Sequence, residues 1–143
     1  MDRLDRAILQ ELAGNGRLTN VELADRVGLT PAPCLRRVRR LEESGVITGY
    51  RAVIDPQALG QAFEVLVNID LSLQDGPTVS AFEDYVSALE EVVEFRRMFG
   101  QPDYFLRVAT RDIGAYEQFV TDKLTQAPGI AKIDSHLPMK AIK

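Results

Sequence analysis

Two short helical segments joined by a tight, glycine-containing turn restrict the fold of this chain more than any other feature. The first begins at Thr19, whose hydroxyl can cap the backbone N–H of Glu22 while the Glu22 carboxylate reaches back, forming a capping box. The second begins after a glycine turn, because Thr30 is a good N-cap and Pro31 suits a first helical turn. Gly45 supplies its stop. This pairing is typical of a helix-turn-helix motif.

A further amphipathic helix is predicted before this motif. Leu4, Ile8 and Leu12 recur every four residues and form an apolar stripe. The Gly-Asn-Gly stretch at 14–16 is expected to end this helix in the left-handed conformation that Gly and Asn tolerate. Residues 1–50 therefore predict a three-helix DNA-binding domain of the winged helix-turn-helix type.

The last of the three predicted helices has an apolar face and a basic face. At 100° per residue, its apolar arc holds Cys34, Leu35, Val38 and Leu41. The opposite arc holds Ala32, Pro33, Arg36 and Arg40, with Arg37 and Arg39 at its borders. We expect the apolar arc to face the other helices, which makes Cys34 a small core residue rather than a redox sensor.

The basic face is predicted to bind double-stranded DNA. In this motif the second helix lies in the major groove with its N-terminal residues at base edges. The predicted base contacts are Ala32, Pro33 and Arg36, the predicted phosphate contacts are Arg37, Arg39 and Arg40, and Thr30 completes the DNA-binding set. A merely solvated arginine face is the alternative; four arginines in five positions directly after a glycine turn favour DNA.

The charge distribution permits such a partner. The net charge is −4, but residues 1–50 carry eight Arg against seven acids (+1), whereas residues 51–143 carry nine Lys or Arg against fourteen acids (−5). Whether the chain can bind DNA depends on cations close to the DNA rather than on net charge, because salt screens phosphate attraction beyond about 10 Å. No apolar run approaches the roughly 20 residues that cross a bilayer, and the charged start is unlike a signal peptide. We expect a cytoplasmic protein with no membrane partner.

Beyond this module the sequence changes to strand patterns. Residues 46–54 are rich in β-branched and aromatic side chains and predict an extended strand. An Asp-Pro pair breaks it, so residues 51–61 are expected to be a strand and linker between two domains. Residues 62–143 then predict strand, helix, strand, strand, helix and strand, the last running from Ile130 to about Lys140. This order gives a ferredoxin-like βαββαβ domain, and the whole chain is predicted to be α+β.

Three stretches of the first fifty residues resemble the DNA-binding half of the Lrp/AsnC family, the leucine- and asparagine-responsive "feast/famine" regulators of bacteria and archaea. They are residues 17–30 (RLTNVELADRVGLT), 31–42 (PAPCLRRVRRLE) and 45–50 (GVITGY). The Pro-x-Pro-Cys start is similar to the leucine-responsive branch. The resemblance implies that residues 46–54 pair with their counterpart in a second subunit, that dimers assemble further into octamers, and that the second domain senses an amino acid.

The resemblance also implies an effector site where two dimers meet. Gly100-x-x-Asp103-Tyr104 matches the family pattern: Gly100 admits a close ligand, Asp103 would hold an ammonium group, and Tyr104 supplies a ring with a polar tip. The implied effector residues are Gly100, Gln101, Asp103, Tyr104, Ser135 and His136, with an amino acid as ligand and no cofactor or metal. An ordinary hairpin turn is the alternative for residues 100–104, and a surface or interface role is the alternative for His136.

Two other classes of function stay open. An enzyme is disfavoured because no nucleophile–base pair, metal-ligand cluster or phosphate-cradling glycine loop is present in the sequence. A module whose helical half grips protein would bind duplex DNA only weakly and without sequence preference. We therefore predict a non-enzymatic, sequence-specific transcriptional regulator whose oligomeric state and DNA binding respond to a small effector.

Overall fold

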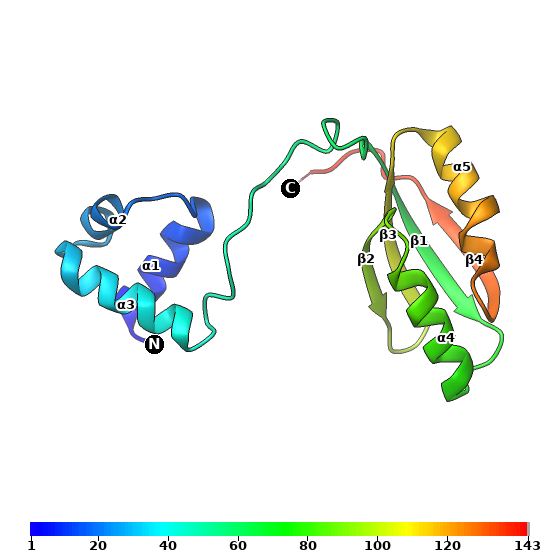
Figure 1. The fold of residues 1–143 in the computed structure, drawn as a ribbon, viewed down its shortest axis with the longest axis horizontal. Helices are drawn as coiled ribbons and strands as arrows, with labels where there is room; N and C mark the ends of the chain where they lie inside the picture. The colour runs from blue at the N-terminus through cyan, green and yellow to red at the C-terminus, as the bar shows by residue number, and fades with distance from the viewer. Residues whose placement is uncertain (143) are drawn as a thin grey trace. The chain divides into compact units, whose positions relative to one another are not determined.

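The structure, a computed structural model, describes residues 1–142. It divides into two compact units, Met1–Val53 and Ile54–Lys143, each with its own apolar core. The first unit is helical, and the second combines a sheet with two helices (Figure 1). Within residues 1–142, every helix is too short or too polar to cross a lipid bilayer.

The first unit contains α1 (Arg3–Gly14), α2 (Asn20–Val27) and α3 (Pro31–Glu43). The capping box predicted at Thr19 is confirmed, because its hydroxyl accepts from Glu22 N–H at 3.2 Å and Glu22 Oε2 accepts from Thr19 N–H at 2.8 Å. Gly28 ends α2 in the left-handed conformation at φ 69°. The helices enclose a small core whose buried members are Ile8, Leu23, Ala24, Cys34 and Leu41.

Two local expectations about this unit were wrong, and a third, Thr30 as an N-cap, was correct only in position. The end of α1 uses no left-handed residue, since its C-cap Asn15 is extended at φ −151° and instead donates its N–H to the carbonyl of Glu11. Thr30 lies at the N-cap of α3, but its side chain makes no capping hydrogen bond. Leu35 is exposed rather than packed inside, because it lies at the edge of the apolar arc.

The second unit is a four-stranded antiparallel sheet covered by two helices, as the predicted βαββαβ order requires. Its elements are β1 (Phe63–Leu71), α4 (Gly76–Ser87), β2 (Val92–Arg97), β3 (Tyr104–Thr110), α5 (Ile113–Asp122), η1 (Leu124–Gln126) and β4 (Ile130–His136). The strand order is β2-β3-β1-β4. Alternate residues of β1, from Val65 to Leu71, are buried beneath the helices, so one face of the sheet carries the core.

Two strand predictions need correction. Residues 46–54 form no strand, and within residues 1–142 the backbone N–H groups of 48–54 donate to no backbone carbonyl. A strand needs a partner ladder, and the described chain offers none to this segment. The last strand ends at His136 rather than near residue 140, because Pro138 has no N–H to continue the ladder.

Candidate nucleic-acid interface and effector site

The exposed side of α3 carries two arginines without acidic partners. Arg36 and Arg39 are exposed, and neither forms an ion pair within residues 1–142. Ala32 is exposed and Pro33 partly so, which leaves a low, accessible surface beside Arg36 at the start of the helix. Five of the residues predicted for DNA are therefore accessible at their surface, namely Thr30, Ala32, Pro33, Arg36 and Arg39.

Arg37 and Arg40 are instead bound to the start of α1. Arg37 Nη1 lies 2.7 Å from Asp2 Oδ2 and 2.8 Å from Asp5 Oδ1. Arg40 Nη2 lies 2.9 Å from both carboxylate oxygens of Asp5. The four arginines of α3 thus divide into two that are free and two that are paired.

Asp5 is a buried acid, with 1% of its surface exposed. The N–H of Asp2 donates to it at 3.0 Å, and with the Arg37 guanidinium it lowers the Asp5 pKa to about 2. The pKa of Asp2 is also lowered, first by the Asp5 N–H and then by Arg37. Both carboxylates are therefore ionised at neutral pH and tie α3 to α1 through charge-assisted bonds.

The approach to this face is concave. A hollow of about 380 Å³ is lined by Pro33, Arg36, Arg37 and Arg40. Behind it, the Asn20 amide donates to the Pro31 carbonyl at 2.7 Å and holds the first turn of α3 against α2. Sequence patterns did not identify the contacts of Asp2, Asp5 and Asn20 with α3, because these contacts join residues 11 to 35 positions apart.

The turn expected to bind an effector is held to the end of β1 by two hydrogen bonds of Asp103. Gly100 has φ +79° and leads into residues 101–103. Asp103 Oδ2 accepts from Leu71 N–H at 2.8 Å, while Asp103 N–H donates to Asp70 Oδ1 at 3.1 Å. Asp103 thus fixes the turn with one carboxylate oxygen, a structural role that its sequence pattern did not reveal.

Tyr104 is buried in the core rather than open to a ligand. Its ring centroid lies 4.8 Å from that of Phe82 and 5.4 Å from that of Phe95, and its hydroxyl donates to Glu83 Oε1 at 2.7 Å. Burial, followed by the bond to Glu83, raises the pKa of Tyr104 to about 12. The phenol is therefore neutral and already committed to a partner.

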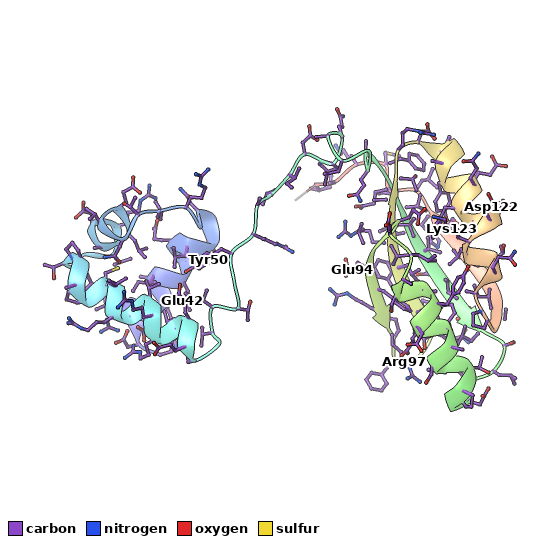
Figure 2. All side chains as sticks on the ribbon, in the orientation of Figure 1. Glu42, Tyr50, Glu94, Arg97, Asp122 and Lys123 are labelled. Carbon is purple, nitrogen blue, oxygen red and sulfur yellow. The ribbon has the colours of Figure 1, made fainter. Side chains whose placement is uncertain are left out.

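A hollow of about 510 Å³ adjoins the turn, and it includes one guanidinium. It is lined by Gln74, Arg97, Met98, Phe99, Gly100 and Asp103. Arg97, labelled in Figure 2, ends β2 and lies 3.7 Å from Glu83 Oε1. The hollow combines a cation, a carboxylate oxygen and apolar side chains, which suits a small zwitterion.

Ser135 and His136 lie elsewhere in the same chain. The sheet register aligns Tyr104 with Ile69 and Ile69 with Ile133, so β1 stands between the turn strand and β4, and Ser135 lies two residues further along. The Ser135 hydroxyl is paired with the Tyr116 hydroxyl of α5. One chain therefore does not bring these two residues to the turn.

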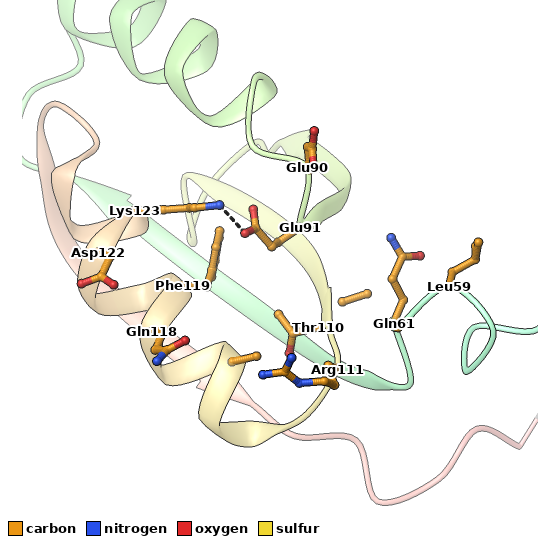
Figure 3. A pocket seen from close by; sticks show the side chains of 13 residues that line it. Leu59, Gln61, Glu90, Glu91, Thr110, Arg111, Gln118, Phe119, Asp122 and Lys123 are labelled. Carbon is orange, nitrogen blue, oxygen red and sulfur yellow. Dashed lines mark hydrogen bonds and ion pairs between the residues drawn. The ribbon is translucent and has the colours of Figure 1, made fainter.

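Another hollow, of about 410 Å³, lies over α5 and the end of β3 (Figure 3). The Lys123 ammonium pairs with the Glu91 carboxylate on one side of it. Its walls carry charges of both signs from Glu90, Glu91, Asp122, Arg111 and Lys123. No sequence pattern marks this hollow, because its residues come from separate segments.

Two family profiles cover nearly all of the chain. Residues 1–48 match the winged helix-turn-helix DNA-binding family, and residues 64–143 match the Lrp/AsnC ligand-binding domain. The chain belongs to the Lrp/AsnC family. The resemblance first seen in residues 17–50 is confirmed, and the family assignment extends through the second domain.

Relatives of this Lrp/AsnC protein are regulators. The Bkd operon transcriptional regulator of Pseudomonas aeruginosa is 42% identical over 142 residues, which cover 99% of this chain and 93% of that protein. The leucine-responsive regulatory protein of Escherichia coli K12 is 40% identical, covering 100% of this chain and 87% of that protein. A Neisseria meningitidis transcriptional regulator, solved as a complex with L-methionine, matches with a TM-score of 0.94 at 34% identity and covers 100% and 92% of the two chains.

This Lrp/AsnC chain is therefore an effector-responsive, DNA-binding transcriptional regulator. Its two halves separate the tasks, with a helix-turn-helix unit for DNA and a ferredoxin-like unit for a ligand. Its fold class was correctly predicted from the sequence, whereas the residues of each site remain predictions.

Proposed function

We propose that the regulator reads a specific duplex sequence through the exposed face of α3, and that an amino acid bound beside the β2–β3 turn alters this binding. The observation that carries the proposal is that Arg36 and Arg39 form no ion pair within residues 1–142, on a helix whose other face is buried. Relatives that are transcriptional regulators support a role in binding rather than catalysis. The place of action that we propose is the cytoplasm, which holds the DNA of bacteria.

The DNA contacts follow from the position of each residue along α3. Arg36, with Ala32 and Pro33 beside it, lies in the first turns, which enter the major groove in this motif. A guanidinium can donate two parallel bonds to one guanine, which gives discrimination of about 1–3 kcal/mol. Arg39 lies one turn later, where a phosphate contact is expected, and the free Thr30 hydroxyl can donate to another.

The proposed effector is a free amino acid in the hollow beside Gly100. Its carboxylate fits the Arg97 guanidinium, and its ammonium fits the carboxylate oxygen that Asp103 does not use for the turn. Gln101 belongs to the same turn. Ser135 and His136 would reach this site only from another copy of the chain, so we propose that the complete site forms between subunits.

Assembly links the two sites. Dimers would read pseudo-palindromic half-sites about one helical turn apart, and further association into octamers would wrap or bridge DNA. The amino acid must bind one assembly state better than another, since equal affinity shifts nothing. A coupling free energy of about 1–3 kcal/mol is ordinary for such a switch.

The test is the substitution Arg36→Ala, measured on a duplex selected by the wild-type protein from a random pool. We expect specific affinity to fall by roughly 5- to 150-fold, the equivalent of about 1–3 kcal/mol, with little change in folding. Arg111→Ala in the sensing domain is the matched loss of charge and should keep full affinity. Equal binding by wild type and Arg36→Ala would show that Arg36 contacts no base.

A further inference from the structure

The four arginines of α3 differ in what surrounds them, although the sequence makes them look equivalent. Arg40 is 61% exposed at its side chain and lies directly after Arg39, yet it shares the buried carboxylate of Asp5 with Arg37. Arg36 and Arg39 meet no acid within residues 1–142. Exposure alone therefore does not tell which guanidinium is available to a ligand.

We infer that Asp5 is a positioning residue for DNA recognition: it holds Arg37 and Arg40 on α1, fixes the setting of α3, and leaves Arg36 and Arg39 as its DNA-binding cations. This inference rests on the proposed function. It revises the expectation that Arg37, Arg39 and Arg40 all contact phosphates. Asp2 assists as the outer acid, bound to Arg37 and half-exposed.

The cost of exchanging partners supports this division. For Arg37 or Arg40 to turn its bonded N–H groups to a phosphate, Asp5 would lose a cation while its carboxylate stayed buried. Asp5 would keep its other arginine, but removing one cation from a buried carboxylate that is bonded to two is still unfavourable. Arg36 and Arg39 exchange only water and loosely held ions for phosphate, so they release counterions without breaking a bond in the protein.

The sharpest test compares neighbouring residues of identical chemistry, Arg39→Ala and Arg40→Ala, in the full chain on the selected duplex. Each phosphate contact contributes about 0.9 to the slope of log affinity against log salt concentration. We expect Arg39→Ala to flatten the slope by about 0.9, whereas Arg40→Ala leaves the slope unchanged and lowers the unfolding temperature. Equal flattening by both variants would overturn the division.

A second test removes the acid. Asp5→Asn should free two guanidinium groups, steepen the salt slope on unrelated DNA by up to about 1.8, and reduce the ratio of specific to nonspecific affinity. Glu43→Gln removes the same charge from α3, at a residue with no ion pair within residues 1–142, and should leave both quantities unchanged. If Asp5→Asn lowers stability alone, the positioning role is wrong.

The comparison of Arg39→Ala with Arg40→Ala tests the inference even if Asp5→Asn does not fold. Failure of the proposed function looks different, because wild-type protein itself would then show no preference for any selected duplex. If only the inference fails, the wild-type protein still recognises its selected duplex, and Arg40→Ala flattens the slope of log affinity against log salt concentration as much as Arg39→Ala does.

Discussion

At Asp5, one carboxylate meets three separate demands. It closes the capping box of α1 by accepting the Asp2 N–H, it accepts from Arg37, and it accepts from Arg40. Asp5 does so while buried, with 1% of its surface exposed. A substitution here therefore changes a helix start and a helix–helix contact at once.

The ionisation of Asp5 predicts how stability responds to acid. Its folded pKa of about 2 lies below the ordinary value of 3.8, so its charged form stabilises the folded state above pH 4, and this contribution disappears as the pH falls toward 2. We expect the difference in unfolding temperature between wild type and Asp5→Asn to be constant from pH 7 to about 5 and to shrink below pH 4. Thermal unfolding followed by circular dichroism measures it. A difference that persists unchanged at pH 2 would exclude this ionisation as its source.

Helical periodicity could predict which way each residue of α3 points, but not what it meets. The projection correctly buried Cys34 and Leu41 and exposed Arg36. It could not find the partner of Arg40, because Asp5 lies 35 positions earlier and no local pattern connects them. The same limit applies to Asp103, whose partner Leu71 is 32 positions away.

Among the helices, the two threonine N-caps give a controlled comparison. The Thr19 hydroxyl accepts the Glu22 N–H, whereas the Thr30 hydroxyl caps nothing. We expect Thr19→Ala to lower the free energy of unfolding by about 1 kcal/mol. Thr30→Ala should change it by less than about 0.5 kcal/mol but weaken DNA binding by about 1 kcal/mol, the value of one lost hydrogen bond.

Urea denaturation and fluorescence anisotropy on the selected duplex separate these effects. Thr19→Ala serves as the control for binding, since any loss of affinity that it shares with Thr30→Ala reflects the fold rather than a contact. Equal stability losses in the two variants would mean that the Thr30 hydroxyl does cap α3.

Strands were predictable from the sequence where their partners lie in the same chain. The sequence correctly placed β1 to β4 in order along the chain, and the period-two pattern is clearest in β1, whose alternate residues are buried in the core. Residues 46–54 have the composition of a strand but no partner within the described chain, so their pairing with a second subunit stays a prediction. Strand propensity describes a surface suited to pairing, not the pairing itself.

At the scale of the whole molecule, two separate cores predict two separate unfolding events. The helical unit packs around Ile8 and Cys34, whereas the sheet unit packs around Phe82 and Leu106. A ligand bound only to the folded sheet unit stabilises it by about 2.7 kcal/mol at one hundred times its dissociation constant. We expect a matching amino acid at that concentration to raise the sheet unit's transition by roughly 10–20 °C and to leave the helical transition in place.

Differential scanning calorimetry with each of the twenty amino acids measures this shift and identifies the effector. Arg97→Ala is the test of the site, because it should abolish the shift without removing the transition. An amino acid that still stabilises Arg97→Ala as fully as wild type would place the ligand elsewhere.

The unpaired backbone of residues 48–54 has a consequence for cells with several such regulators. Within residues 1–142 these N–H groups donate to no backbone carbonyl, and any extended segment of another polypeptide offers the same main-chain geometry. Main-chain hydrogen bonds do not distinguish one chain from another. Selective pairing of identical subunits through this segment would therefore depend on its exposed side chains, which include Val46, Tyr50, Val53 and Ile54. From the subunit pairing that the family resemblance implies for this segment, we expect that exchanging a few of these side chains for a paralogue's residues would produce mixed dimers that read composite operators.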